Sequence, residues 1–318
     1  MSDLIGNGLH FATIALTVGI SSLSVGLGEG LTGRTALKAM DKQPKAQSDI
    51  LRAVIFGNAL IETAAVLSVF IAFILISTMH GSYALGTHIA EIGIALAICI
   101  SSFVIGIAAS LPAQEACLAI ARQPFFADNI IRFMFISQSL IQTPIIFSFI
   151  IAIFISYKAV AIHTVAEGLA LVAAGLCLGF GSIGPVIGLG RFAQEACRGL
   201  GINRAAYTNI TAFSVISLAI IETPIIFALL ISILLIFYAS GVSLLQSIAF
   251  ICAAFCMGIG TTGPGVASSR TATAACHQIA LKPEVYGMIS TVSMFGQGII
   301  DTCAIYSFLI AIILIFLL

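Results

Sequence analysis

The four residues Ile-Glu-Thr-Ala at 61–64 recur as Ile-Gln-Thr-Pro at 141–144, as Ile-Glu-Thr-Pro at 221–224 and as Ile-Asp-Thr-Cys at 300–303. The later copies follow the first at almost equal intervals along the chain. Self-similarity at a fixed period is the signature of a repeat protein, in which each repeat is one supersecondary unit. The sequence therefore predicts four tandem copies of one small structural unit.

The period divides the chain into repeats at 1–80, 81–160, 161–240 and 241–318. A second motif supports this division, because Gln-Glu-Ala-Cys at 114–117 returns one period later at 194–197. Each repeat has the same plan: an apolar stretch rich in glycine, a short polar segment, and a second apolar stretch rich in Ile and Phe. Glycine at this density lets helix backbones approach closely in lipid, which predicts a tightly packed layer of first helices.

Composition identifies a membrane protein. Of the 318 residues, 60% are hydrophobic and only 8% are charged, whereas a soluble domain carries roughly 25% charged residues. Apolar stretches long enough to cross about 30 Å of hydrocarbon recur along the whole chain. Backbone groups in lipid must be satisfied within their own segment, so each stretch is expected to be a helix. We expect an all-α membrane protein of eight transmembrane helices, arranged as four tandem helical hairpins.

The polar turns inside the hairpins carry nearly all of the positive charge. They hold 12 of the 13 basic residues: Arg34, Lys38, Lys42, Lys45, Arg52, Arg122, Arg132, Arg191, Arg198, Arg204, Arg270 and Lys282. Only Lys158 belongs to the other side. The positive-inside rule then places the turns in the cytoplasm and both termini outside. A net charge of zero gives no indication of nucleic-acid binding.

Four acidic residues lie deep in apolar stretches: Glu29, Glu62, Glu222 and Asp301. An ionised side chain at the bilayer centre costs at least about 2.5–3.5 kcal/mol, so such residues are functional candidates. Three of them occupy one repeat position, where the second copy has Gln142 instead. Glu62 follows Pro44 by nearly the same spacing as that by which Glu29 precedes it, so an antiparallel hairpin brings these two acids to a similar depth.

An isolated carboxylate in lipid must be protonated or must coordinate a cation, because desolvation disfavours the charged form. It gives up the ion only where water or a positive partner stabilises the anion. That behaviour is what an ion carrier requires. A single buried carboxyl group can also be purely structural, but three equivalent acids at one repeat position favour transport.

Each repeat resembles the c subunit, the proteolipid of rotary ATP synthases. The matching features are the glycine-rich first helix at 26–30 (Gly-Leu-Gly-Glu-Gly), the polar turns at 42–44 (Lys-Gln-Pro) and 121–124 (Ala-Arg-Gln-Pro), and the carboxylate within the second helix. The Ala-Arg-Gln-Pro turn resembles the F-type family. A usual F-type proteolipid is a single hairpin, whereas fused hairpins that lack a carboxylate resemble V- and A-type proteolipids. The V/A-type ATPase therefore stays open as an alternative.

The resemblance implies a rotor ring with the glycine helices inside and the carboxylate helices outside. Ions would load and unload against a stator a-type subunit, and the turns would dock the central stalk through Lys42, Gln43, Pro44, Arg122, Gln123 and Pro124. We expect a homo-oligomeric ring of two to four chains, three being preferred, embedded in lipid in a bacterial inner membrane. No cofactor and no ATP site are expected in this chain, because its glycine runs lack the Lys-Ser/Thr ending of a phosphate-binding loop.

The transported ion is predicted to be a proton, with sodium as the alternative. Sodium-carrying relatives place oxygen ligands on the first helix and beside the carboxylate, since a hard cation needs several oxygens. A hydroxyl follows the key position in every repeat: Thr63, Thr143, Thr223 and Thr302. The first-helix partner position holds Glu29, Ala109, Leu189 and Ser268. The first repeat, with Glu29, Glu62 and Thr63, resembles a sodium site, whereas the third, with Leu189, resembles a proton site.

The remaining polar residues are not predicted to carry ions. Gln142 cannot ionise, so one chain is predicted to carry three ions. Glu91 and Glu167, near His88 and His163, are expected to be solvated at the membrane interface. Glu115 and Glu195, close to Arg122 and Arg198, are expected to be surface or ion-pair residues. A repeat-built secondary transporter is the less favoured alternative, because two-helix repeats all share one orientation whereas such transporters usually contain inverted repeats. A purely structural proteolipid would not need aligned carboxyl groups.

Overall fold

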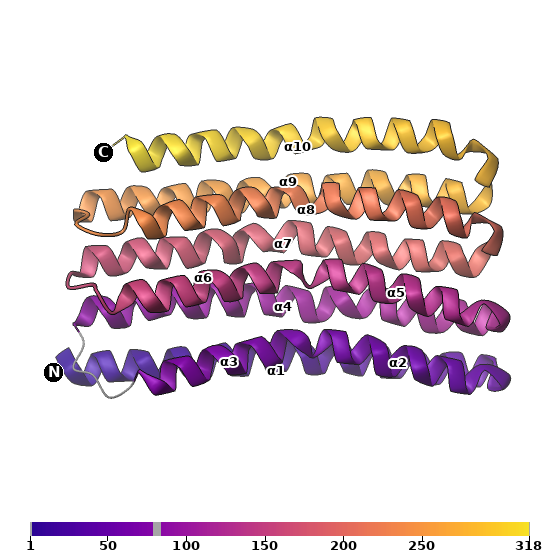
Figure 1. The fold of residues 1–318 in the computed structure, drawn as a ribbon, viewed down its shortest axis with the longest axis horizontal. Helices are drawn as coiled ribbons and strands as arrows, with labels where there is room; N and C mark the ends of the chain where they lie inside the picture. The colour runs from indigo at the N-terminus through magenta and orange to yellow at the C-terminus, as the bar shows by residue number, and fades with distance from the viewer. Residues whose placement is uncertain (1, 79–83, 318) are drawn as a thin grey trace.

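The computed structural model describes residues 2–78 and 84–317 as a flat stack of long, nearly parallel and antiparallel helices (Figure 1). Both termini lie at one end of the helices, and the tight turns within the hairpins lie at the other end. The helices are α1 (Ser2–Lys42), α2 (Gln47–Ile61), α3 (Thr63–Ser77), α4 (Leu85–Arg122), α5 (Ala127–Ile141), α6 (Thr143–Ala159), α7 (Val165–Ile202), α8 (Tyr207–Phe237), α9 (Leu244–Leu281) and α10 (Tyr286–Phe316).

Eight membrane-spanning units emerge from these ten helices within the described residues. In the first two hairpins the returning span is interrupted once, where α2 gives way to α3 at Glu62 and α5 gives way to α6 at Gln142. The chain is barely disturbed at the first of these points, because the backbone N–H of Glu62 still bonds to the carbonyl of Asn58 at 2.9 Å. The eight candidate spans are 34 to 38 residues long. At about 1.5 Å per residue they exceed roughly 50 Å, so their ends project beyond a hydrocarbon core of about 30 Å.

Each hairpin turns through one short 3₁₀ segment that follows a non-helical residue. Gln43 adopts φ −139° and ψ 79° before Pro44, outside the helical region that a following proline disfavours. The third hairpin has no proline at this place. There the side chain of Asn203 accepts a hydrogen bond from the backbone N–H of Ala205 at 3.0 Å, which holds the same turn by a local cap.

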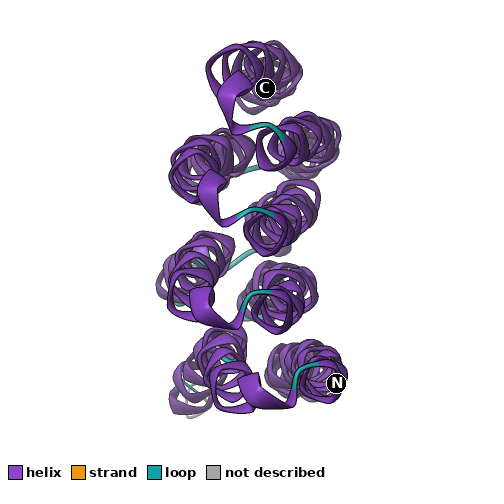
Figure 2. Cartoon of the chain, turned by 90° about the vertical axis from the view of Figure 1, so that its right-hand side faces the viewer, coloured by secondary structure: helices purple, strands orange, loops and turns teal. Residues whose placement is uncertain are grey.

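The spans form two rows, seen end-on in Figure 2. The first helices of the hairpins (α1, α4, α7 and α9) are in extensive contact with one another. The second helices contact their counterparts much less and are spaced more widely. A two-row strip with one tight row and one loose row bends toward the tight row, so the first helices lie on the concave side.

Glycine accounts for the close packing of the first helices. A methyl group added at these positions would collide with backbone of the next first helix: Gly28 with the carbonyl of Gly106, Gly175 with that of Gly93, and Gly188 with that of Gly265. No larger residue fits there without separating the helices. The predicted layer of close-packed first helices is therefore present, and van der Waals contact between backbones is what holds the row together in lipid.

Candidate ion-binding site

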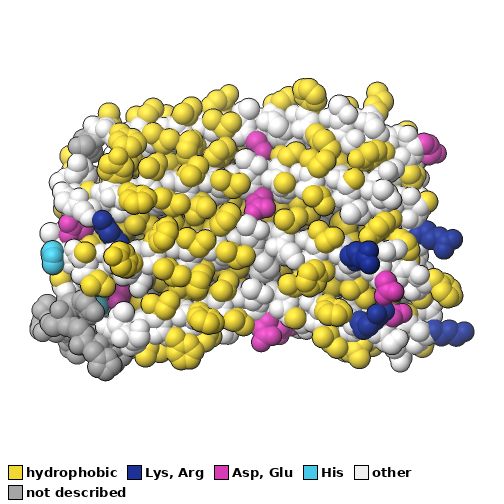
Figure 3. Space-filling view, viewed as in Figure 1, with side chains coloured by type: hydrophobic (Ala, Val, Ile, Leu, Met, Phe, Trp, Pro, Cys, Tyr) yellow, Lys and Arg dark blue, Asp and Glu magenta, His cyan; other side chains and the backbone are white. Residues whose placement is uncertain are grey.

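The predicted carboxylates lie at one depth along the helices. The spacing from the first residue of the 3₁₀ turn is identical in all four hairpins: Pro44 to Glu62, Pro124 to Gln142, Arg204 to Glu222 and Pro283 to Asp301. About five helical turns of about 5.4 Å each place this position roughly 27 Å from the turn, near the middle of the span. Figure 3 shows acidic side chains aligned near the middle of the long axis, between apolar surfaces, with most of the basic side chains at one end.

Asp301 is held by its own hairpin. Its side chain is largely buried, at 9% exposure. The hydroxyl of Ser268, on the first helix of the same hairpin, donates a hydrogen bond to Asp301 Oδ1 at 3.1 Å. The sequence predicted Ser268 as the first-helix partner of this acid, and the structure brings the two side chains together.

Glu222 is completed by the preceding hairpin. Glu222 is also 9% exposed, and the hydroxyl of Thr143 in α6 lies close enough to interact with its carboxyl group. The first-helix partner position in its own hairpin, Leu189, is fully buried and offers no oxygen. The carboxyl group therefore lies between two hairpins, with one hydroxyl beside it. Sequence reasoning placed Thr143 next to the inert Gln142, and no signal in the period indicated that it serves the following hairpin.

Glu62 lies at the open edge of the strip. Its side chain is exposed, and the nearby Glu29 is half-buried. The two carboxyl groups are close enough to interact electrostatically, as the predicted equal depth requires. Thr63 is half-buried beside them. Within the described residues no hairpin precedes the first one, so nothing there covers Glu62 as α6 covers Glu222.

Gln142 occupies the equivalent position without a partner. Its side chain is 4% exposed, and neither its amide nitrogen nor its amide oxygen has a hydrogen-bond partner in the described structure. One turn earlier, the amide nitrogen of Gln138 donates to the carbonyls of Ala109 at 2.8 Å and of Gly57 at 3.2 Å. The second hairpin thus keeps the geometry of the site but has no group that can ionise.

Two predicted hydroxyl ligands do not contact a carboxylate within the described parts of the chain. Thr223 donates to the carbonyl of Ala219 at 3.2 Å, and Thr302 donates to the carbonyl of Ile299 at 2.7 Å. Both side chains bond their own helix, as serine and threonine readily do in apolar surroundings. Thr302 belongs to the last hairpin, at the outer edge of the strip.

The turn end carries the polar contacts that the sequence suggested. Arg122 pairs with Glu115 at 3.0 Å, and Arg198 lies 3.7 Å from Glu195, which also contacts His277 at 2.8 Å. Of the two alternatives for Glu115 and Glu195, surface or ion-pair residues, the structure therefore shows ion pairs.

The residues predicted to dock a stalk lie around the same turns. Their exposure differs from one to the next: Lys42, Pro44 and Arg122 are exposed, whereas Gln43, Gln123 and Pro124 are half-buried. The amide nitrogen of Gln123 donates to the carbonyl of Gly201 at 3.1 Å and so ties one turn to the next.

The expectation for Glu91 is wrong. Interfacial solvation was predicted, but Glu91 is 5% exposed and lies against two histidines. Glu167 is not simply solvated either. Its carboxylate accepts hydrogen bonds from the backbone N–H groups of Thr164 at 3.0 Å and Gly241 at 2.8 Å, which caps α7 and ties two loops together. The sequence placed both acids near the ends of their helices, and Glu91 near His88, but it did not bring His10 to Glu91 or Gly241 to Glu167.

Comparison with known proteins agrees with this arrangement. The family model for the ATP synthase c subunit matches residues 12–75, 92–155, 172–235 and 251–314. A stretch of 64 residues is 42% identical to ATP synthase c subunit 2 of Cereibacter sphaeroides, covering 20% of this chain and 77% of that protein. The ATP synthase c subunit of Alkaliphilus oremlandii is 37% identical over 79 residues, 24% of this chain and 90% of the relative. That of Dehalococcoides mccartyi is 43% identical over 74 residues, 23% of this chain and 97% of the relative.

Each relative is matched by about one hairpin, and four such hairpins follow one another here. The eight long apolar helices agree with this assignment. The chain is an integral membrane protein that belongs to the ATP synthase c subunit family, whose members form the rotor ring.

Proposed function

We propose that this chain carries protons as a four-hairpin segment of the rotor ring of an F-type ATP synthase, through Glu62, Glu222 and Asp301. The observation that carries the proposal is the equal depth of the three acids, each at the same spacing from the start of its 3₁₀ turn in an otherwise apolar span. Each acid holds a proton while it faces lipid and exchanges it beside a stator a-type subunit. A membrane potential contributes about 2.3 kcal/mol per charge per 100 mV to this movement.

The ligand count favours a proton over sodium. Asp301 has one hydroxyl donor, Ser268, and Glu222 has one, Thr143. A hard cation requires several oxygen ligands, whereas a proton requires a single carboxyl group. Glu29, Glu62 and Thr63 together offer the largest number of oxygen ligands. One ring carries one ion species, however, so the sites with the fewest oxygen ligands determine which ion that is.

A closed ring explains why Glu62 is uncovered in the single chain. Glu222 is covered by the hairpin that precedes it. In a ring the last hairpin of another copy would precede the first, so Thr302 would stand beside Glu62 as Thr143 stands beside Glu222. The large apolar side chains exposed at both edges of the strip would be buried by the same contact. They include Leu16 and Leu23 on α1 and Val292 and Phe295 on α10.

The proposed closed ring also determines the possible ring sizes and the orientation of the chain in the membrane. Two, three or four chains would close a ring of 8, 12 or 16 hairpins, and we favour three. The repeats at 1–80, 81–160, 161–240 and 241–318 would each occupy one ring position. The turns would face the cytoplasm of a bacterial cell and dock the central stalk through the residues around Pro44 and Pro124, with both termini on the outer side of the inner membrane.

Carbodiimide labelling tests the proposal, because this reagent modifies protonated carboxyl groups in apolar surroundings. Mass spectrometry of the purified chain should find three labels, on Glu62, Glu222 and Asp301. Removing one acid, for example by Glu222→Gln, should remove one label and lower ATP-driven proton pumping. Glu115→Gln, which changes the ion pair near the turns, is the control and should leave the label count at three.

Two results would contradict the proposal. Labelling confined to acids near the turns would show that the deep carboxyl groups are not protonated carriers. Protection of all three acids by sodium ions, at constant pH, would replace the proton by sodium while leaving the carrier role intact.

A further inference from the structure

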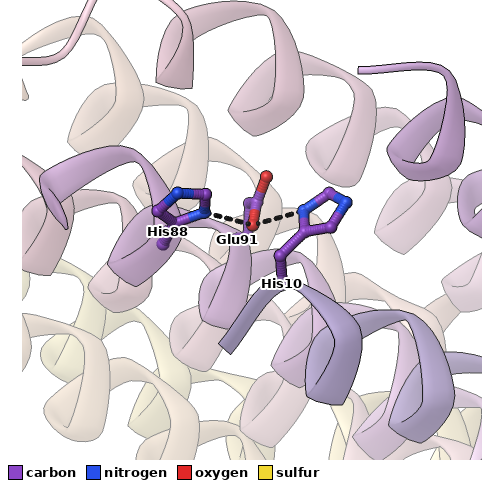
Figure 4. Close-up of side chains that lie close together, drawn as sticks. All are labelled: His10, His88 and Glu91. Atoms are coloured by element: carbon purple, nitrogen blue, oxygen red, sulfur yellow. Dashed lines mark hydrogen bonds and ion pairs between the residues drawn. The ribbon is translucent and has the colours of Figure 1, made fainter. Parts of the chain in front are cut away.

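A buried cluster of His10, His88 and Glu91 joins the first two hairpins at the end where the termini lie (Figure 4). His10 comes from α1, whereas His88 and Glu91 come from the beginning of α4. In Figure 4 the two imidazole rings flank the carboxylate from opposite sides. Glu91 Oε2 lies 2.9 Å from Nδ1 of His10 and 3.4 Å from Nδ1 of His88. The cluster is far from the mid-span acids and takes no part in the proposed ion transport.

Water has little access to this cluster. The side chains of His10, His88 and Glu91 are 5%, 9% and 6% exposed. Within the described residues, the ion-pair contacts of Glu91 are to these two histidines. Nε2 of His10 is buried without a hydrogen-bond partner, so the polar contact of that ring is the one toward the carboxylate. A buried carboxylate is costly unless it is neutralised by a proton or a metal ion.

The three ligand atoms already have the spacing of a metal site. All of them lie within 4.8 Å of one another. Bonds of about 2.0–2.1 Å to a tetrahedral zinc ion place neighbouring ligand atoms about 3.3 Å apart. The two distances from the histidine nitrogens to Glu91 Oε2, 2.9 and 3.4 Å, bracket that separation, and the two nitrogens lie within 4.8 Å of each other. Imidazole nitrogens suit zinc and similar transition metals rather than sodium or magnesium, so the donor set also selects the class of ion.

A small polar cavity lies beside the carboxylate, on a side that neither histidine lines. A cavity of about 10 Å³ adjoins Glu91 and is also lined by Thr87 and Ser156. A space of this size with polar walls holds about one water molecule. Zinc sites with three protein ligands commonly take water as the fourth.

The repeat shows that the cluster is specific to one of the hairpin contacts. Positions equivalent to His10 hold Ala90, Ala170 and Ala249, those equivalent to His88 hold Gly8, Gly168 and Ser247, and those equivalent to Glu91 hold Phe11, Leu171 and Phe250. All three polar ligands therefore replace small or apolar residues at once, and only where α1 meets α4. Gly6 adds to this, because a side chain there would occupy the space of the His88 ring.

We propose that His10, His88 and Glu91 bind one divalent transition-metal ion per chain, zinc being the ion that fits the donor set. The bound ion links α1 to α4 by coordination and thereby fixes the first hairpin against the second. Its role is structural, because it replaces a buried proton by a coordinated cation at an interface that otherwise depends on van der Waals contact.

Metal titration of the purified, chelator-treated chain tests the proposal. Isothermal titration with zinc should give one site per chain, and cobalt should give the visible absorption of a tetrahedral nitrogen- and oxygen-ligated ion. Loss of a residue that only orients a ligand already weakens metal binding by about 10–100-fold. Removing a direct ligand by His10→Gln or Glu91→Gln should therefore weaken zinc binding at least about 100-fold. Zinc should also raise the unfolding temperature of the wild-type chain but not of these variants.

His163 provides the matched control, because it is an exposed histidine at the same end of the helices. His163→Ala should leave the stoichiometry, the affinity and the cobalt spectrum unchanged. A wild-type chain that binds no zinc would overturn the proposal and leave a hydrogen-bonded triad. Zinc binding that survives both Gln variants, or that is lost in His163→Ala, would overturn it as well. These outcomes are independent of carbodiimide labelling at mid-span.

Discussion

Converting Gln142 into a carboxylate should change the number of ions that the rotor moves for each ATP. Gln142→Glu keeps the size of a side chain that is 4% exposed and has no hydrogen-bond partner in the described structure. Thr143 lies one hairpin before Glu222 and interacts with it. Thr63 occupies the equivalent position one hairpin before Gln142, so the same repeat geometry supplies a hydroxyl partner there. We expect the new carboxyl group to be protonated and to carry an ion.

The expected magnitude follows from the number of acids. One chain would carry four ions in place of three, so the number of ions moved for each ATP should rise by about one third. At about 2.3 kcal/mol per charge per 100 mV, the contribution of one chain rises from about 7 to about 9 kcal/mol for each 100 mV of potential. The variant should make ATP at a lower membrane potential than the wild type and should need more ions to do so.

The assay is the ratio of ions translocated to ATP hydrolysed by the whole complex in proteoliposomes, together with the carbodiimide label count. Gln142→Met is the control for a change at this position without a new charge, and it should leave both the ratio and the three labels unchanged. A wild-type chain with a fourth label would refute the reasoning. A fourth label in Gln142→Glu without any change in the ratio would refute the claim that the position contributes to transport.

Further predictions concern the packing of the chain, and unfolding of the detergent-solubilised protein measures each of them. Gly93→Leu should separate α4 from α7 and cost about 3 kcal/mol or more, whereas Gly287→Leu, where an added carbon meets nothing within 4 Å, should change stability by less than about 0.5 kcal/mol. Ser148→Ala removes the 2.7 Å hydrogen bond to Ser101 and should cost about 1 kcal/mol; no loss would mean that lipid or water replaces the bond. Gly241→Ala forces a side chain into φ +71° and should cost about 1 kcal/mol, so an unchanged midpoint would contradict a strained loop.

The sequence predicted the architecture well because the local sequence determines both the direction of each span and the depth of the site within it. Apolar length indicates the spans, the polar turns indicate the hairpins, and the spacing from Pro44 to Glu62 indicates the level of the site. The period even anticipated the partnership of Ser268 with Asp301, because both belong to one hairpin. These features depend on local sequence and on the bilayer, so they need no knowledge of neighbouring hairpins.

Contacts between side chains of different hairpins could not be predicted in this way. Thr143 follows Gln142 in the chain but interacts with Glu222 of the next hairpin. His10 and Glu91 are far apart in the sequence, yet their side chains meet at 2.9 Å. A residue one position off the repeat period falls on a different face of its helix, and the rotation of adjacent helices decides whether the two faces meet. That rotation is set by the glycine contacts between backbones, which a hydrophobicity pattern does not contain.

Covalent linkage of the hairpins fixes the order in which charged and uncharged positions reach the stator. In a ring of 12 hairpins, successive positions would be one twelfth of a revolution apart, and every fourth one would arrive at the stator carrying the uncharged amide of Gln142. The advance from Glu62 to Glu222 would then cover twice that arc without an intermediate charge, while each of the other advances covers it once. Rotation of such a ring would be recorded as a repeating pattern of two short steps and one long step, and the tether between hairpins prevents this order from being shuffled during assembly.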